Sequence, residues 1–492
     1  MLPTIATGNV ASATAGGYEV ANSCMFNDGD SAYMTTTGLS TPTSKRAATF
    51  SFWIKRGNLG INTAFFGGES DSNDYGQIGF DSSDNLQCYI EINGSTELNL
   101  ITSAVYRDSS AWYHFALIID GSQATPANRA KLYVNGTQVT AFGTSDYMNQ
   151  NTDLAFLETH LPANAFIGVR KQAGSLSRYF DGYIAEAVYL DGTIAAIGDL
   201  GEFDSDSPTI WKPIDVSGLT FGNNGFYLDF EDSGDLDDDE SGNGNDFTAS
   251  NLAATDQALD SPTNNWCTMN PLNVPTSNPP PFEQGNLKTT SPGSGSNILK
   301  FGGTSTIGMT QGKWYLEAKA TVDGTYSRNV IGITGEASSC ASLNRAFDLQ
   351  TNSCFGYGSE GGDSISNNST ASYGNTYTTG DIIGVAIDLD NMKLYFSKNG
   401  TWQNSGNPES GATGTGAISI STALASTTDG IYFVMQGDNT GSSANSIFEF
   451  NFGSPIYTIS SSNADGNGYG NMEYAVPANY YLLNTKNLAE YG

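Results

Sequence analysis

Short segments in which apolar and polar residues alternate recur along the whole chain. In ATFSFWIKR (48–56), Phe50, Phe52 and Ile54 fall on one face, as expected for a β-strand with one buried side. Comparable segments are TAFFGG (63–68), NLQCYIEI (85–92), WYHFALIID (112–120), AFIGVR (165–170), YFDGYIAEAVYL (179–190), KWYLEAKA (313–320), NVIGITG (329–335), DIIGVAIDLD (381–390), GIYFVMQG (430–437) and SIFEFNFG (446–453). Gly, Asn, Asp and Ser separate them, and no long segment has helical periodicity. The pattern predicts an all-β protein made of antiparallel sheets.

One hairpin phrase occurs twice, as KLYVNG (131–136) and KLYFSKNG (393–400). Asn-Gly between two strands favours a tight turn, because both central residues of a type I′ turn need positive φ. The strands around the two copies do not align with each other. We therefore reject an internal repeat. The shared sequence indicates two different sandwiches that use the same type of hairpin.

The segments between the two strand-rich blocks set the expected domain boundaries. DSGDLDDDESGNGND (232–246) is an acidic loop, and SPTNNWCTMNPLNVPTSNPPPFEQG (261–285) is a Pro- and Asn-rich connector. We predict an N-terminal arm (1–22), a first sandwich (23–230), the acidic loop with the extended connector (231–285), a second sandwich (286–455) and a polar, Tyr-rich C-terminal tail (456–492).

Charge and cysteine content narrow the possible partners and compartments. The 492 residues include 20 Lys and Arg against 51 Asp and Glu, a formal net charge of −31 that argues against nucleic-acid and anionic membrane partners. We expect no membrane insertion, since no run of 18 apolar residues exists, and the N-terminus resembles no signal peptide. The five cysteines are expected to be mostly reduced in a protein assembled in a cytoplasm, with Cys340 and Cys354 as the one pair considered for a bridge.

The first strand-rich block resembles a known domain family. WYHFALIIDGSQATPANRAKLYVNG (112–136) and FDGYIAEAVYLDG (180–192) resemble the central and closing strands of laminin G-like, concanavalin A-like domains. The resemblance implies a jelly-roll sandwich over about 23–230.

The second block resembles a SPRY domain. GKWYLEAKA (312–320), IGIT (331–334), FGYG (355–358), GDIIGVAIDLDNMKLYFSKNG (380–400) and FEFNFG (448–453) follow the order of that family's motifs. The resemblance implies a second sandwich that works as a recognition module, with no catalytic residues to transfer.

Further segments resemble sequences around such domains in tailed-phage fibre proteins, namely FGNNGFYLDF (221–230), SPTNNWCTMNP (261–271) and PANYYLLNTKNL (477–488). This resemblance implies a virion structural protein, with a tail fibre or receptor-binding protein that recognises a host surface glycan as the leading interpretation. Its expected partners are other virion proteins, the glycan and copies of itself, as a trimer. A capsid decoration or head-fibre protein and a secreted bacterial adhesin are the alternatives among binding proteins.

A glycosidase or depolymerase on the same fold is the enzymatic alternative. Such an enzyme needs two carboxylates flanking a glycosidic bond, and no Glu-x-Asp-x-Glu stretch occurs in the chain. Glu186 stands alone between alanines, and the only histidines, His114 and His160, lack a nucleophile motif beside them. We therefore predict that the protein is not an enzyme.

Two groups of residues are the candidate binding sites. Tyr357, Tyr373 and Trp402 fall in segments rich in Gly, Ser and Asn, so we expect them to be exposed rings that stack on a neutral glycan at the outer end of the SPRY sandwich. In the acidic loop, Asp235, Asp237, Asp239 and Ser241 offer hard oxygen ligands for a calcium ion, the one cofactor considered. An EF-hand is excluded because Thr248 stands at its twelfth position, so a solvated acidic loop is the alternative.

Overall fold

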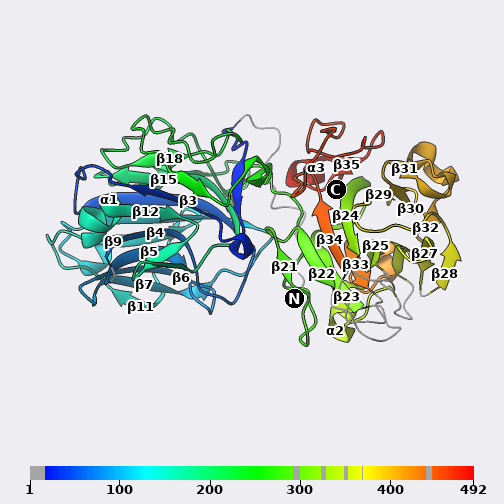
Figure 1. The fold of residues 1–492 in the computed structure, drawn as a ribbon, viewed down its shortest axis with the longest axis horizontal. Helices are drawn as coiled ribbons and strands as arrows, with labels where there is room; N and C mark the ends of the chain where they lie inside the picture. The colour runs from blue at the N-terminus through cyan, green and yellow to red at the C-terminus, as the bar shows by residue number, and fades with distance from the viewer. Residues whose placement is uncertain are drawn as a thin grey trace. The chain divides into compact units, whose positions relative to one another are not determined.

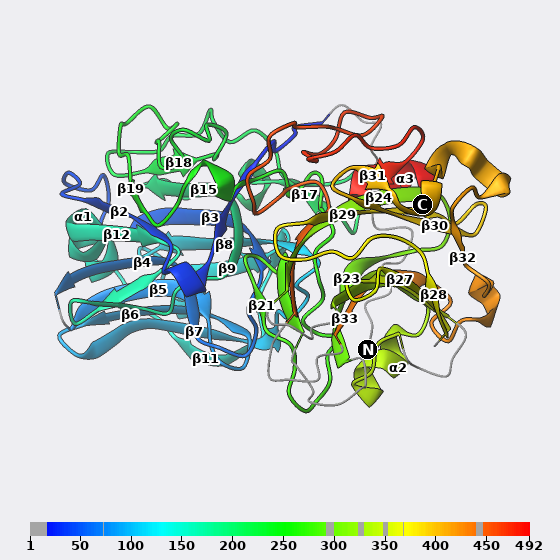
Figure 2. The same cartoon turned by 45° about the vertical axis from the view of Figure 1, so that its right-hand side comes forward.

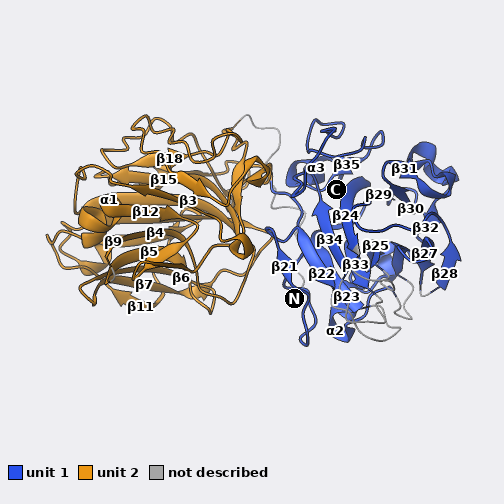
Figure 3. Ribbon diagram, in the orientation of Figure 1, with its two compact units in different colours: residues 1–13, 265–492 blue, residues 14–264 orange. Residues whose placement is uncertain are grey.

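The computed structural model describes residues 17–71, 73–291, 300–322, 329–347, 353–367, 369–438 and 446–492. These residues form two compact units, unit 2 ending at Asn264 and unit 1 running from Asn265 to Gly492 (Figure 3). The boundary therefore lies inside the expected connector. Most of the expected N-terminal arm lies outside the described residues.

Unit 2 is a sandwich of two antiparallel sheets (Figures 1 and 2). Sheet A has the order β10 (Thr137–Gln138), β9 (Ala130–Val134), β8 (Trp112–Asp120), β3 (Ala47–Arg56), β15 (Gly182–Asp191), β1 (Ser23–Phe26) and β20 (Gln257–Ala258), and β18 (Phe226–Leu228) also pairs with β15. Sheet B has the order β11 (Phe142–Asp146), β7 (Ser95–Val105), β6 (Asn85–Ile92), β5 (Asp74–Phe80), β4 (Thr63–Asp71), β12 (Asn164–Ile167), β2 (Tyr33–Thr37) and β19 (Thr248–Ser250). Two small hairpins are β13 (Arg170–Gln172) with β14 (Ser175–Ser177), and β16 (Glu202–Phe203) with β17 (Trp211–Lys212).

The core of unit 2 lies between the two sheets. Phe50, Phe52 and Ile54 point into it, which confirms the alternation expected for β3. Phe50 contacts Phe66 of sheet B with ring centroids 5.4 Å apart. A second apolar cluster, formed with residues of the segment 195–227, covers the opposite face of sheet A. Sheet A is therefore buried on both faces.

Residues beyond the expected end of the first sandwich complete unit 2. Leu236 of the acidic loop and Phe247, which directly follows the loop, lie in its core, β19 pairs with β2, and β20 pairs with β1. The structure thus places residues 231–264 within the sandwich. Long-range strand pairing recruits a polar segment whose local sequence predicted a connector.

Unit 1 is also an antiparallel sandwich, apart from one short parallel pair. One sheet has the order β21 (Phe282–Glu283), β22 (Lys288–Ser291), β34 (Ser446–Asn451), β24 (Lys313–Val322), β29 (Ile382–Asp388), β30 (Lys393–Lys398) and β31 (Thr401–Trp402), with β32 (Ile418–Ser419) on β30 and β35 (Tyr481–Leu482) on β24. The other has the order β23 (Lys300–Met309), β33 (Tyr432–Asp438), β25 (Asn329–Thr334), β26 (Cys354–Gly358), β27 (Asp363–Ser366) and β28 (Ser369–Ser372). The expectation of two successive β-sandwiches is confirmed.

The C-terminal residues pack on unit 1. Strand β35 runs parallel to β24, and Leu483 and Met472 are fully buried. The carboxylate of Glu317 on β24 accepts hydrogen bonds from the backbone amides of Glu473 and Tyr474, at 2.9 and 2.8 Å. Residues 456–492 therefore form part of the sandwich unit, although their polar composition predicted a tail.

Helices are short in both units. The α-helices are α1 (Leu161–Ala163), α2 (Ala337–Leu343) and α3 (Thr485–Tyr491), a π-helix spans Phe156–His160, and 3-10 turns span Asp28–Asp30, Pro126–Asn128, Ile197–Asp199, Ala254–Asp256, Gln403–Ser405, Pro408–Thr413 and Leu424–Ser426. Within the described ranges, none is long and apolar enough to cross a membrane.

The repeated hairpin phrase has the same structure in both units. Asn135 and Asn399 have φ of 46° and 47°, the positive values expected for the turn. Asn135 donates its backbone N–H to the carbonyl of His114 (2.9 Å), and its side-chain oxygen accepts from the amide of His114 (2.7 Å). Asn399 makes the same pair of bonds with Ile382, at 2.8 and 2.9 Å. Each asparagine thus adds one more pair of hydrogen bonds between its hairpin and the neighbouring strand.

The glycine of each phrase lies beneath an aromatic ring. A Cβ atom on Gly136 would come within 2.2 Å of the Trp211 indole, and one on Gly400 within 2.6 Å of the Tyr474 ring. Both glycines also have positive φ. Only glycine satisfies both conditions, so the geometry of the hairpin accounts for the recurrence of the sequence.

All five cysteines are buried, and none of them forms a disulfide in the described part of the chain. Cys340 and Cys354 both contact the hydroxyl of Thr334, at 3.7 and 3.2 Å. Burial raises the pKa of the Cys340 thiol well above its usual value. The pair considered for a bridge is therefore adjacent but reduced in this structure.

Candidate functional site

The outer face of sheet B, turned away from the core, carries polar side chains in a regular pattern. In β6, Leu86, Cys88 and Ile90 are buried, whereas the alternate residues Gln87 and Tyr89 are only partly buried. This pattern is typical of an antiparallel sheet with one face towards solvent. Because sheet A is covered on both faces, the partly exposed side chains of this face, among them Gln87 and Tyr89, are the candidate ligand contacts of unit 2.

Three amide side chains form a relay across this face. Gln77 on β5 donates its Nε2 to Oε1 of Gln87 on β6 (3.2 Å), and Gln87 donates its Nε2 to Oδ1 of Asn99 on β7 (3.5 Å). Strands β5, β6 and β7 are consecutive in the sheet (Figure 1). Each amide donates to the next, so the relay runs from Gln77 to Asn99. At its start, the Oε1 acceptor of Gln77 is buried without a hydrogen-bond partner among the described residues.

Two tyrosines lie beside the relay on the same face. The rings of Tyr75 on β5 and Tyr89 on β6 are 5.7 Å apart. The Tyr89 hydroxyl donates to the carboxylate of Glu91, and burial together with this bond raises the pKa of Tyr89 to about 12. Tyr89 stays a neutral phenol at physiological pH, so the face offers an aromatic surface next to amide groups.

The β13–β14 hairpin folds over one side of this face. It comes close to the sheet because residue 67 is a glycine, and a Cβ atom there would lie 3.1 Å from the carbonyl oxygen of Val169. Tyr75 and Gln77 are buried, whereas Tyr89 and Asn99 are only partly buried. The hairpin therefore forms a raised edge beside the relay.

Tyr357 and Tyr373 are not exposed binding residues, which corrects the expectation from the sequence. Tyr357 lies in β26, is fully buried, and packs against Phe396 with ring centroids 5.4 Å apart. Tyr373 is 7% exposed and accepts a hydrogen bond from the amide of Phe396 (3.2 Å). The Gly residues of FGYG mark close packing in a strand, since a Cβ atom on Gly356 would lie 2.6 Å from the Phe347 ring.

Trp402 is the one predicted aromatic that stays accessible. It belongs to the short strand β31 and is partly exposed. Its ring meets Tyr315 edge to face, with centroids 6.4 Å apart. Trp402 therefore stays a candidate ligand contact in unit 1.

His114 has a structural role, as its hydrogen bonds show. Nδ1 accepts from the indole N–H of Trp211 (3.1 Å), so Nε2 carries the proton and donates to Ser51 Oγ (2.8 Å). Ser51 thus faces a donor and has no base to activate it. His160 similarly donates Nε2–H to the carbonyl of Glu91 (2.9 Å), and burial lowers its pKa.

The carboxylates of the acidic loop bind backbone amides. Asp239 Oδ1 accepts from the amides of Tyr227 (2.9 Å) and Ser241 (3.0 Å), and Oδ2 accepts from the amide of Asn245 (2.9 Å) and the Ser241 hydroxyl (2.8 Å). Asp237 accepts from the amide of Ala249.

Asp235 is exposed in the same loop, and a hydrogen bond with the Asp237 carboxyl raises its pKa. In the described part of the chain, no group of three or more His, Cys, Asp and Glu residues is placed to hold a metal ion. Asp235, Asp237, Asp239 and Ser241 organise a loop, and calcium binding stays a prediction without a converging ligand set.

Glu186 is the most perturbed carboxyl group on sheet A. It occupies a β-bulge with φ of 48° and accepts from the hydroxyls of Tyr227 (2.9 Å) and Tyr18 (3.3 Å). Burial raises its pKa to about 8. The charges of the Asp229 and Glu231 carboxylates raise this pKa further. The expectation that the protein is not an enzyme stays a prediction.

The relay residues Gln77, Gln87 and Asn99 were missed by the sequence analysis. The signal for part of the site was present, because NLQCYIEI places Gln87, Tyr89 and Glu91 on one face of a single strand. The other members come from different strands, so only the register of the sheet brings them together.

Both sandwiches match sequence families. Residues 28–195 match the family described as the concanavalin A-like lectin/glucanases superfamily, and residues 313–417 match the SPRY domain family. The first match lies in unit 2 and the second in unit 1.

Three solved structures illustrate the similarity. A heptameric SAP-like pentraxin from Limulus polyphemus is 14% identical, over 36% of this chain and 80% of that chain, with a TM-score of 0.28. A candidate carbohydrate binding protein from Bacteroides ovatus is 16% identical, over 48% of this chain and 61% of that chain, with a TM-score of 0.32. Stonustoxin is 16% identical, over 38% of this chain and 27% of that chain, with a TM-score of 0.25.

All three TM-scores are below 0.5, so the fold assignment rests on the family matches and on the strand topology described above. The chain contains a concanavalin A-like domain followed by a SPRY domain.

Proposed function

We propose that the protein recognises a glycan and that unit 2 binds it on the outer face of sheet B. The observation that carries this proposal is the relay of Gln77, Gln87 and Asn99 beside Tyr75 and Tyr89. Amides donate and accept hydrogen bonds at once, which suits the adjacent hydroxyl groups of a sugar. Flat aromatic side chains provide apolar contact at low entropic cost.

The family match supports the same proposal. The superfamily of unit 2 is described by its lectins and glucanases, both of which bind carbohydrate. Between these two, we favour binding, because no Glu-x-Asp-x-Glu stretch occurs in the sequence. Incubation of the full chain with host envelope polysaccharides is expected to release no oligosaccharides, and release abolished by one Asp or Glu substitution would establish a depolymerase instead.

We further propose that the glycan is a host surface glycan and that the protein stands on a virion, as a tail fibre or receptor-binding protein. The support is the resemblance of residues 221–230, 261–271 and 477–488 to sequences of tailed-phage fibre proteins. Trimeric assembly would multiply weak single-site binding. Antibody labelling of intact particles tests the location, since labelled capsids would favour a capsid decoration or head-fibre protein and unlabelled particles would contradict a virion role.

Replacing Gln87 with alanine is expected to weaken glycan binding about tenfold. The change removes the central amide, and each net hydrogen bond contributes about 0.5–1.5 kcal/mol. Binding is measured on an array of bacterial surface glycans and then by calorimetry with the best ligand. The matched control is Gln138→Ala on the exposed edge strand β10 of sheet A. Equal loss in both variants, or none in either, would contradict the proposed face.

Trp402 is a second candidate contact, in unit 1, because it is partly exposed on the SPRY sandwich. Particles carrying Trp402→Ala are expected to adsorb less well to the host. By analogy with stacking of bases on aromatic rings, the loss is about 1–3 kcal/mol per site. The control is Tyr357→Phe, which changes a buried aromatic in the same unit. Unchanged adsorption by folded, incorporated Trp402→Ala protein would leave Trp402 a structural residue.

A further inference from the structure

Two arginines stand on the β13–β14 hairpin, at the raised edge of the proposed glycan face. Arg170 is the first residue of β13, and Arg178 follows the last residue of β14. The guanidinium carbon of Arg170 lies 5.5 Å from the centroid of the Tyr75 ring, over the ring face. The two arginines are close enough that the positive charge of Arg178 contributes, after burial, to lowering the pKa of Arg170.

Neither guanidinium is neutralised by a carboxylate of the described residues. Arg170 donates Nη2–H to Ser177 Oγ (3.1 Å), while its buried Nε–H has no acceptor in the described part of the chain. The charge of the Asp81 carboxylate opposes the lowering of the pKa of Arg178 that burial causes. By contrast, Lys171 of the same hairpin pairs with Glu69 at 3.2 Å.

This arrangement is unusual for the molecule. The chain has 51 acidic residues against 20 basic ones, and its fully buried basic groups have acidic partners: Lys55 pairs with Asp260 and Arg56 with Asp84. Two half-buried arginines close together repel each other, which is unfavourable unless an anion lies between them. Arg178 also has a positive φ of 59°.

We propose that Arg170, over the ring of Tyr75, and the neighbouring Arg178 bind the anionic group of an acidic sugar in the ligand of unit 2. The inference rests on the proposed glycan-binding function and names its ligand class, a sugar that carries a carboxylate or a sulfate. A guanidinium presents planar, paired N–H donors that match the oxygens of either group. Gln77 lies opposite Gly67 and is buried beneath the hairpin, so the same sugar would meet the partly exposed Gln87 and Tyr89.

The negative charge of the whole chain does not oppose this contact at short range. Exposed charges are screened beyond about 8 Å at physiological ionic strength, so the local arginines dominate once the ligand has arrived. The net charge of −31 slows the approach of an anion and makes the local site the determinant of specificity. The neutral glycan expected from the sequence concerned the loops of unit 1, so the two units would differ in ligand.

The test compares sugars that differ only in charge. The full chain is titrated by calorimetry with a short oligogalacturonate and with the same oligomer after reduction of its carboxyl groups. Dextran sulfate and dextran form the second pair and separate sulfate from carboxylate as the anionic group. We expect one acidic member to bind at least about tenfold more tightly than its neutral counterpart, with an affinity that falls as salt is raised.

Three variants assign the effect to the hairpin. Arg170→Gln and Arg178→Asn are each expected to weaken binding of the acidic sugar about tenfold and to leave binding of the neutral one unchanged. Asparagine is chosen at position 178 because it tolerates positive φ. Arg46→Gln is the control, since Arg46 pairs with Asp153 and should leave both affinities unchanged. Near-ultraviolet circular dichroism verifies that each variant is folded. If Arg178→Asn does not fold, the test rests on Arg170→Gln alone.

The outcomes separate this inference from the proposed function. Equal binding of acidic and neutral members, with dependence on Gln87, would overturn the inference and leave glycan recognition standing. Acidic binding that both hairpin variants retain would also overturn it. If none of the four sugars binds, the inference falls for carboxylated and sulfated sugars alike.

Discussion

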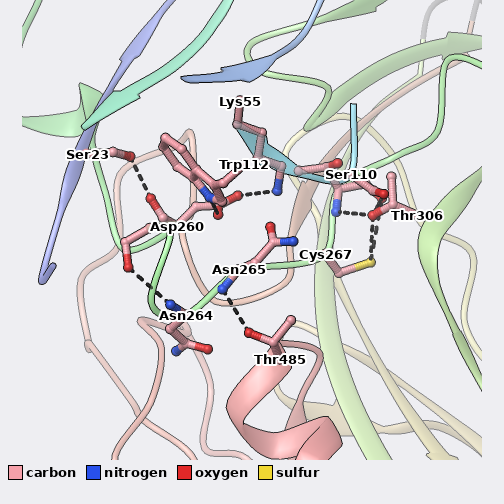
Figure 4. Close-up of polar contacts among 12 residues, drawn as sticks. Ser23, Lys55, Ser110, Trp112, Asp260, Asn264, Asn265, Cys267, Thr306 and Thr485 are labelled. Atoms are coloured by element: carbon pink, nitrogen blue, oxygen red, sulfur yellow. Dashed lines mark hydrogen bonds and ion pairs between the residues drawn. The ribbon is translucent and has the colours of Figure 1, made fainter. Parts of the chain in front are cut away.

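Replacing Asp260 with asparagine is expected to lower the free energy of unfolding of unit 2 by about 3–5 kcal/mol. Asp260 Oδ2 lies 2.6 Å from Lys55 Nζ, and both side chains are 2% exposed or less. Its other oxygen accepts from the indole N–H of Trp112 (2.9 Å), as Figure 4 shows. The substitution leaves the Lys55 ammonium buried opposite a neutral amide, which is the costly half of a broken buried ion pair.

Two comparisons make this result specific to the buried charge. Asp153→Asn removes a partly exposed partner of Arg46 and should cost about 1 kcal/mol or less. The double variant Lys55→Met, Asp260→Asn should be more stable than Asp260→Asn alone, because it also removes the desolvation cost of the buried Lys55 ammonium. Urea unfolding measures all four proteins. A loss for Asp260→Asn no larger than that for Asp153→Asn would contradict the assigned role.

The same contact explains why the end of unit 2 was not located from the sequence. Asp260 lies 205 positions from Lys55, and the backbone carbonyl of Asp260 also accepts from the hydroxyl of Ser23 (2.6 Å), near the start of the unit. Such contacts fix residues 257–264 on the sandwich, but nothing in the local Pro- and Asn-rich sequence reveals them. The connector was predicted from composition, whereas its structure is determined by partners distant in sequence.

Local sequence patterns predicted the fold, because strand alternation and turn formation depend on residues that are neighbours in the sequence. Alternation in β3 identified Phe50, Phe52 and Ile54 as core residues, and Asn-Gly identified both hairpins. The same reasoning failed for Tyr357, because glycines beside an aromatic residue were interpreted as a loop. In the structure, they allow close packing within a strand.

The candidate site was less predictable than the fold for a geometric reason. Its relay joins Gln77, Gln87 and Asn99 from three strands, and a shift of one residue in register would turn any of them into the core. Arg170 and Arg178 reach the same face from a hairpin that follows a fourth strand, β12. Single-sequence reasoning finds residues of one strand, as with Gln87 and Tyr89, and misses the assembly of several strands.

The second large effect is an acid destabilisation caused by His114. Burial lowers the pKa of His114 to about 3, whereas an unfolded histidine titrates near 6.5. Between these values the unfolded state binds one more proton than the folded state, so stability decreases as the pH falls. The stability contributed by the neutral imidazole is complete above about pH 6.5 and is lost as the pH falls towards 3, at about 1.4 kcal/mol per pH unit.

Comparison of the wild type with His114→Asn isolates the contribution of His114 to the pH dependence of stability. The carboxylates titrate in both proteins, so their contribution cancels. The difference in the free energy of unfolding between the wild type and this variant is expected to shrink by about 2 kcal/mol from pH 6.5 to pH 5. Trp211→Phe should lessen the slope, because it removes the indole N–H that occupies Nδ1 and opposes its protonation. A difference that stays constant from pH 7 to pH 5 would show that the pKa of His114 is the same in the folded and unfolded protein, and would reopen a basic role beside Ser51.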